Sequence, residues 1–309
     1  MHAHLTQNTA ISLLDDLPTT KKIALNSKRN KAQDNSDELD ELAARFQYSD
    51  CKDSYWQQEQ YSLLYGTRLW DEASEAQRKL LNHLYWVAYY CQIISAEIAT
   101  IYLNQAAGAG LYSVEDFRVV CDGLDLESSQ ERAHIAAFKK ISEDIEYEVF
   151  GERMFTYPMR AYDVDTMIFS NSNKVKEYWR RMQIRAYSVM STGNAFLGCQ
   201  YFTVRGLRTL NGKLVQHQLS QHVIDSSDRL AMPIPSQVSF HHFLDESFHF
   251  NTSKIISHEV VRSIKPPTAF ERKITNKLML GVQKDHFHFS TAINGIFWYD
   301  QAKIGRAHV

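Results

Sequence analysis

The chain has few residues that interrupt helices and few signals of a special environment. Of its 309 residues only 12 are glycine and 6 are proline, which favours long uninterrupted helices. No run of about 18 apolar residues occurs, so the sequence predicts no membrane span. Lys and Arg (34) nearly balance Asp and Glu (36), and a net charge of -2 gives no sign of the basic surface that nucleic-acid binding requires.

The cysteines and the N-terminus carry no export signal. No C-x-x-C pair occurs, and the scattered cysteines are typical of free thiols in a reducing compartment rather than of a disulfide framework. They are Cys51, Cys91, Cys121 and Cys199. The first residues lack the basic stretch and the apolar stretch of a secretory signal. We therefore expect a cytoplasmic protein.

Apolar residues recur at spacings of three and four over five stretches, which predicts five long helices. These stretches cover about residues 80–101, 114–150, 175–208 or as far as 222, 236–264 and 269–293. The first is expected to end where Ala106 and Gly108 follow, and an interruption of the second near Gly123 is left open. No stretch shows the alternation of a strand, so the sequence predicts an all-α helical bundle.

Three segments are predicted along the chain. Residues 1–45 contain a long stretch of Lys, Asn, Asp, Ser and Glu with few large apolar side chains, which predicts a disordered polar leader. Residues 46–303 would form the helical bundle. Residues 304–309 continue no helical pattern and match the translation of a widely used sequencing adapter, so we expect a non-native tail in place of further natural sequence.

Glutamate and histidine stand at unusual places in two of the predicted helices. Glu97 lies in the middle of a strongly apolar helix, where a lone buried carboxylate would need a cation, a metal or a proton. Glu131 and His134 follow as a Glu-x-x-His pair, and residues three apart project from the same helix face. Two alternatives stay open: Glu97 is exposed on a misphased helix, or Glu131 and His134 form a surface pair in a polar stretch.

A third set lies in the fourth predicted helix. His242, Glu246 and His249 are spaced by four and three residues, which places them within about 60° of one another around the helix. A single buried histidine is more often satisfied by the backbone than by a metal. The coincidence of all three sets nevertheless favours a metal site. Together they supply most of the ligands of a ferritin-like dimetal carboxylate bundle, in which the fifth helix would be an extra C-terminal one.

The combined pattern resembles the dimetal-carboxylate N-oxygenases typified by the p-aminobenzoate N-oxygenase of the aureothin pathway. That family has a lone Glu, a Glu-x-x-His, a second lone Glu and then His-x-x-x-Glu-x-x-His. The resemblance covers about residues 80–258 and implies six metal ligands here. They are Glu97, Glu131, His134, His242, Glu246 and His249.

The second lone Glu of the family pattern is missing. No glutamate occurs between Tyr178 and Asp245, and the corresponding neighbourhood offers Gln216, His217 and Gln218. One of these supplies the seventh ligand, or the position stays open for a halide or solvent. A ligand-bound imidazole usually donates its other nitrogen to a carboxylate, so an outer shell of supporting residues is also expected. The candidates are Asp245, Asp285 and His288.

The chain is more similar to a distant branch of that family, the cyanobacterial halogenases typified by the one in cylindrocyclophane biosynthesis. This similarity rests on the missing Glu and on an overall likeness of the segments around Glu97 and Glu131. This resemblance implies two iron ions, with manganese as the alternative, and the use of dioxygen and chloride to halogenate an unactivated carbon of a fatty acyl chain. It also implies an acyl carrier protein or a small molecule as substrate partner and an electron donor; a homodimer is left open. Amine N-oxygenation and a non-catalytic metal-binding or interaction protein remain alternatives.

Overall fold

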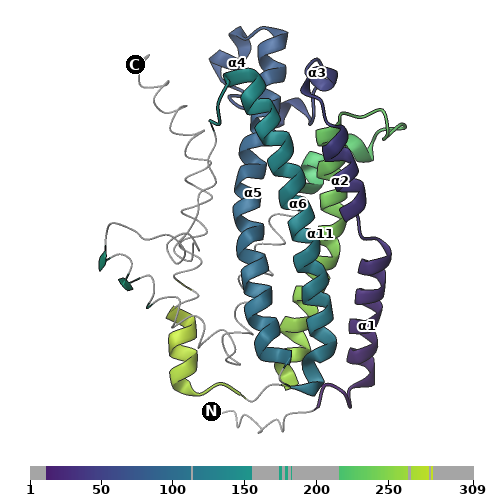
Figure 1. Cartoon of the computed structure of the whole chain (residues 1–309), viewed down its shortest axis with the longest axis vertical. Coiled ribbons are helices and arrows are strands. Elements are labelled where there is room, and N and C mark those ends of the chain that lie inside the picture. Colours follow the sequence, from purple (N-terminus) through teal and green to yellow (C-terminus); the bar gives the residue numbers. More distant parts are fainter. Residues whose placement is uncertain are drawn as a thin grey trace, which may run out of the picture.

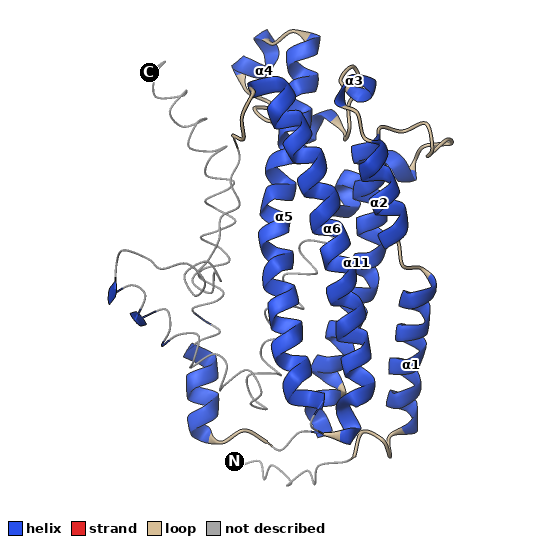
Figure 2. Ribbon diagram, in the orientation of Figure 1, coloured by secondary structure: helices blue, strands red, loops and turns tan. Residues whose placement is uncertain are grey.

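The computed structural model describes residues 12–112, 114–154, 216–263 and 266–277, together with positions 174, 175, 178, 179, 182 and 280. Within these ranges the regular secondary structure is helical and none of it is strand (Figure 2). The prediction of an all-α helical bundle is confirmed. Among the described helices, none combines the length and the apolar composition needed to cross a bilayer.

Three long helices form the centre of the bundle (Figure 1). They are α5 (Glu75–Tyr112), α6 (Arg118–Phe150) and α11 (Ile234–His258). α5 and α6 lie side by side, connected through the short 3-10 helix η2 (Glu115–Phe117). α6 continues past Gly123 without a break, and α5 continues through Gly108 rather than ending there. A glycine inside a helix costs only about 1 kcal/mol, which the packing of two long helices offsets.

The ends of the long helices follow local rules. α6 ends at Gly151, whose φ of 76° lies in the left-handed region and whose N–H donates to the Tyr147 carbonyl at 3.0 Å. Glycine adopts this conformation without the steric penalty of a side chain. α11 begins directly after Pro233 and carries Pro235 in its first turn, where the missing N–H has no helical partner to lose.

Two helices occupy the segment that was predicted to be a disordered leader. They are α1 (Leu17–Ala32) and α2 (Ser36–Arg45), which Figure 1 shows along one side of the bundle. α2 buries Leu39 and Leu42 completely in the central core. The prediction of disorder is therefore wrong for residues 17–45.

Polar contacts explain why the composition of this segment was misleading. Asp16 caps α1 by accepting the N–H of Thr19 at 3.2 Å. Asn26 Nδ2 donates to Thr252 Oγ1 of α11 at 3.0 Å. Part of the polarity of this segment therefore serves a helix cap and a contact with α11 rather than exposure to water. The first eleven residues and the predicted tail 304–309 lie outside the described residues.

Shorter helices complete the described chain. They are α3 (Tyr48–Cys51), η1 (Glu59–Tyr61), α4 (Arg68–Glu72), η4 (Val260–Ser263) and helices over residues 216–224 and 269–277. The last two agree with one end of the predicted third helix and with the start of the predicted fifth helix. The remainder of both predicted helices lies mostly outside the described residues.

An aromatic core joins the three long helices. The rings of Tyr90 on α5 and Phe138 on α6 lie 4.1 Å apart between centroids. Trp86 is buried, and its Nε1 donates to Ser239 Oγ of α11 at 2.9 Å. Phe138 also packs against His242, with 4.9 Å between ring centroids. The core therefore extends directly to the predicted metal ligands and fixes the helices that carry them.

Candidate metal centre

Seven carboxylate and imidazole side chains meet between α5, α6 and α11. α5 supplies one of them, and α6 and α11 supply three each at the same spacing of four and then three residues. They are Glu97 of α5, Glu127, Glu131 and His134 of α6, and His242, Glu246 and His249 of α11. That spacing places three side chains on one face of a helix. The structure thus brings together all six predicted ligands and adds Glu127.

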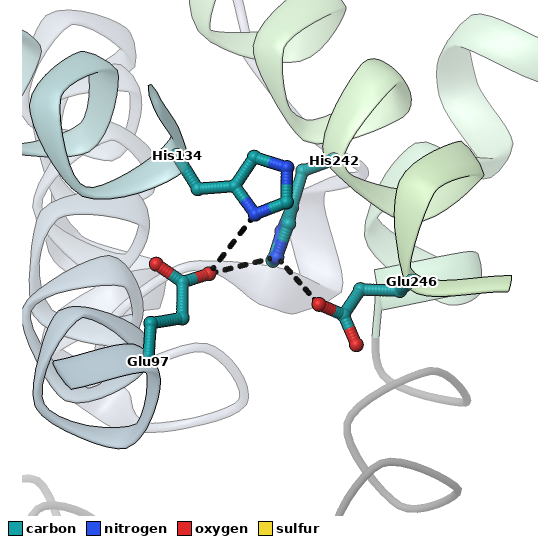
Figure 3. A group of neighbouring side chains, drawn as sticks. All are labelled: Glu97, His134, His242 and Glu246. Carbon is teal, nitrogen blue, oxygen red and sulfur yellow. Dashed lines mark ion pairs between the residues drawn. The ribbon is translucent and has the colours of Figure 1, made fainter. Parts of the chain in front are cut away.

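Four of these residues form a first group, drawn in Figure 3. Glu97 Oε1 lies 3.0 Å from His242 Nε2 and 3.5 Å from His134 Nδ1. Glu246 Oε1 approaches the same His242 nitrogen at 3.5 Å from the other side. One donor atom of each residue lies within 4.8 Å of the others, which is close enough for a single cation to contact all four.

Glu127, Glu131 and His249 form a second group at the same spacing limit of 4.8 Å. Glu131 Oε1 lies 3.4 Å from His249 Nδ1. The side chains of all three residues are almost completely buried. The alternative of a surface pair for Glu131 is therefore excluded, as is an exposed position for Glu97, which is 4% exposed.

Two carboxylates connect the groups. Glu131 contacts His249 through Oε1 and His134 through Oε2, the latter at 3.3 Å. Glu246 Oε1 lies 3.0 Å from His249 Nδ1 and also faces His242. Each of these glutamates therefore touches a histidine of both groups. A carboxylate in that position can place an oxygen on each of two neighbouring cations.

The outer nitrogen of His134 is held by a carboxylate. His134 Nε2 lies 3.1 Å from Asp245 Oδ2, while its Nδ1 faces the site. Asp245 is fully buried, and its Oδ1 accepts a hydrogen bond from Asn35 Nδ2 at 2.6 Å. Asp245 thus occupies the supporting position that the sequence predicted. Asn35, in the turn before α2, was not predicted.

His249 is supported in the same way by an amide. Its Nε2 lies 3.0 Å from Gln130 Oε1. The Gln130 amide in turn exchanges hydrogen bonds of 2.8 and 3.2 Å with the amide of Asn30 on α1. Both histidines that follow a glutamate by three residues therefore point Nδ1 into the site and bond Nε2 outside it. A support of this kind fixes the ring orientation of a metal ligand.

Burial and carboxylates together set the protonation of the site. Burial raises the pKa of Glu131 to about 7, although the neighbouring His249 opposes this shift. Burial alone would lower the pKa of His134, but its bonds to Asp245, Glu131 and Glu97 raise that pKa well above its ordinary value. The pKa values of the other two histidines in the site are also raised by nearby carboxylates, against the effect of burial. The carboxylates thus favour the protonated imidazoles, and a metal ion that binds the imidazoles competes with these protons.

Of the three candidates for the seventh ligand, one reaches the site. Gln216 is buried, and its Nε2 lies 3.4 Å from His242 Nε2. Its Oε1 is buried without a hydrogen-bond partner among the described residues. His217 and Gln218 are exposed. Gln216 therefore presents a neutral amide to the first group.

Two predicted residues cannot be placed, and three further residues of the site or its surroundings were not predicted. Asp285 and His288 lie outside the described residues. Glu127 could have been found, because it precedes Glu131 by four residues and so shares its helix face. Nothing local in the sequence pointed to Gln130 or Asn30, since they meet across 100 residues of chain.

Comparison with known proteins gives one match. The family described as "Acyl halogenase CylC-like" matches residues 18–307. The matched region starts one residue into α1 and includes every residue of both groups. No curated protein and no solved structure matches the chain.

Proposed function

Because the chain belongs to the CylC-like acyl halogenase family, we propose that it is a dimetal oxidoreductase that halogenates an unactivated C–H bond of an acyl chain. The observation that carries the proposal is the pair of buried Glu and His groups joined by Glu131 and Glu246. Several buried carboxylates around three imidazoles are unstable unless cations compensate them. Two metal ions would supply that compensation.

The residues present fit two ions of iron or manganese. Carboxylate oxygen and imidazole nitrogen are donors that these metals accept, and a ferritin-like bundle builds such centres from facing helices. Glu97, His134 and His242 would hold one ion and His249 the other. Glu131 and Glu246 would bind both. Redox-active metal bound there supplies the activation of dioxygen that attack on an aliphatic C–H bond requires.

The neutral side chain of Gln216 would allow a halide to bind beside the first group. A carboxylate at this place would repel an anion, whereas an amide adds no charge and offers an N–H as donor. The Gln216 amide already lies in contact with His242. We infer that this neutral residue favours chloride next to the metal. The same feature favours halogenation over amine N-oxygenation, whose family pattern has a glutamate here.

The aromatic core would protect the reaction from water. Phe138 and Tyr90 are fully buried, and their ring centroids lie 4.9 and 5.9 Å from that of His242. A dry apolar wall suits an aliphatic substrate and limits side reactions of a strong oxidant. The acyl chain would be presented on an acyl carrier protein. Replacing C–H by C–Cl while reducing dioxygen to water also consumes two electrons, so an external donor is required.

Product analysis tests the proposal. Protein loaded with ferrous iron without oxygen would be mixed with saturated fatty acyl groups of several lengths on an acyl carrier protein, then exposed to dioxygen with a reductant and chloride. We expect mass spectrometry to show replacement of one hydrogen by chlorine, and of one hydrogen by bromine when bromide replaces chloride. Glu131→Gln protein is the inactive control. Hydroxylated or desaturated acyl products at every halide concentration would retain the oxidase and contradict the halogenase.

A further inference from the structure

Glu127 is the residue of the site that has no assigned role. It lies on α6 one turn before Glu131 and is completely buried. One of its carboxylate oxygens lies within 4.8 Å of donor atoms of both Glu131 and His249. It therefore faces the second group and not the first.

Without Glu127 the two groups would offer unequal numbers of ligands to their metal ions. A metal ion in the first group would have Glu97, His134 and His242 to itself, in addition to the shared carboxylates. An ion in the second group would have only His249 to itself. Iron and manganese with oxygen and nitrogen donors usually bind about four to six of them. The second ion would have three protein donors without Glu127 and four with it.

The charge balance of two metal ions also indicates Glu127 as a ligand. Without Glu127 only three carboxylates, Glu97, Glu131 and Glu246, would donate directly to two divalent ions with four positive charges. The buried carboxylate of Asp245 lies behind His134, on its Nε2 side. A net charge buried among apolar helices is strongly disfavoured. A fourth carboxylate balances the two ions before any halide or substrate binds. Glu127 is a fourth carboxylate within reach of a donor group.

Resting on the proposed dimetal centre, we propose that Glu127 is a terminal ligand of the metal ion beside His249, as Glu97 is of the ion beside His134. The centre then has four carboxylates, with α6 supplying two of them from consecutive turns. The neutral amide of Gln216 can remain next to the first group without leaving the centre short of negative charge.

Glu146 provides a matched control on the same helix. It is also completely buried, but its carboxylate accepts the N–H of Met154 at 2.8 Å and lies 3.9 Å from Arg153 Nε. A backbone donor and an arginine account for its burial without a metal. Replacing either glutamate by glutamine keeps the volume and removes one buried charge from the same helix, inside the site in one variant and outside it in the other.

The test is metal binding by wild type, Glu127→Gln and Glu146→Gln under anaerobic conditions. Each protein is titrated with Fe(II) and with Mn(II), desalted and assayed for metal, and the Mn(II) samples are examined by electron paramagnetic resonance for coupling between two ions. We expect two coupled ions in wild type and in Glu146→Gln. Glu127→Gln should keep one ion, with an uncoupled Mn(II) signal and affinity for the second ion reduced at least 100-fold.

The metal-free proteins show whether a folding defect is responsible for any loss of the second ion. Glu127→Gln without metal should stay folded, as Glu146→Gln does, and the melting curves of the three metal-free proteins check this. Glu127→Asp, which keeps the carboxylate but shortens its reach, should fall between wild type and Glu127→Gln in second-ion affinity. Two coupled ions with unchanged affinity in Glu127→Gln would overturn this inference and leave the proposed function intact. Wild type that binds neither metal would overturn both.

Discussion

Two buried histidines of the same bundle have opposite surroundings. His83 on α5 and His134 on α6 are both fully buried. The His83 nitrogens face one hydroxyl and one carbonyl, Tyr48 Oη at 3.1 Å and Ser54 O at 2.8 Å, and its ring stacks on Trp56. Burial lowers the pKa of His83 to about 4, so the ring is neutral.

Among the described residues, the polar partners of the two His134 nitrogens are carboxylates. Glu131 and Glu97 lie beside Nδ1 and Asp245 lies beside Nε2, and together they raise its pKa in spite of burial. A neutral imidazole has one donor and one acceptor, which the surroundings of His83 satisfy. Acceptors on both nitrogens require a cation, either a proton or a metal. The comparison teaches that the partners of a buried histidine, rather than its burial, distinguish a structural ring from a ligand.

The largest expected effect is the loss of stability when metal is removed from the centre that contains His134. Each ion present at about 1,000 times its dissociation constant stabilises the fold by about 4 kcal/mol, so two ions contribute about 8 kcal/mol. Denaturant unfolding of the loaded protein with and without a strong chelator measures this difference. Glu131→Gln should show little response to the chelator. Superimposable curves for loaded and chelated wild type would show that the carboxylates are compensated by protons alone.

The contact of Asp245 with His134 should strengthen the affinity of the site for metal. Asp245→Asn replaces the carboxylate beside His134 Nε2 by a neutral amide. Loss of such a partner typically weakens metal binding about 10- to 100-fold, and we expect a reduction in this range. Competition with a fluorescent chelator measures it. Asp144→Asn is the control: this half-buried residue of α6 pairs with Lys140 away from the site, and the substitution should leave the affinity unchanged.

A substitution of His83 should lower the stability of the fold without changing metal binding. His83→Gln disturbs the bonds to Tyr48 and Ser54, and we expect a loss of about 1 to 2 kcal/mol in the free energy of unfolding. Metal content should stay at the wild-type value. Denaturation and metal analysis of the same sample measure both quantities. A His83→Gln protein that folds normally but loses metal would break the comparison.

The smallest effect is the pH dependence of His83. Its pKa is about 4 when folded and about 6.5 when unfolded, so the unfolded chain binds more protons between these values. Stability from this residue therefore falls as the pH falls through 6.5, by about 1 kcal/mol between pH 8 and pH 6. The stability difference between metal-free wild type and metal-free His83→Gln should shrink by that amount. A difference that is constant over this range would contradict the assignment of a neutral ring.

The fold and most of the site could be predicted from the sequence. His242, Glu246 and His249 share one helix face at spacings of four and three, and these spacings persist in α11. Glu97 was conspicuous because a carboxylate in an apolar helix needs a partner. Helix periodicity needs no knowledge of the rest of the chain, which is why these residues could be found.

The failures have a common cause. Residues 17–45 were predicted to be disordered, and the polar run that begins at Glu127 left a surface position open as the alternative for Glu131 and His134. The two regions meet in the packed bundle through the buried amide pair of Asn30 and Gln130. The polarity of one segment cannot reveal that its partner lies 100 residues away. Only the packed bundle shows that these amides lie behind His249 and that Glu127 faces it.

Metal content of purified protein tests the central claim most directly. Wild type, Glu131→Ala, Glu246→Ala and Glu146→Gln would be reconstituted with ferrous iron under reducing conditions and analysed for iron per chain. Because Glu131 and Glu246 touch histidines of both groups, either alanine substitution should remove both ions, whereas wild type and Glu146→Gln should hold two. Wild type without bound metal would contradict the dimetal centre.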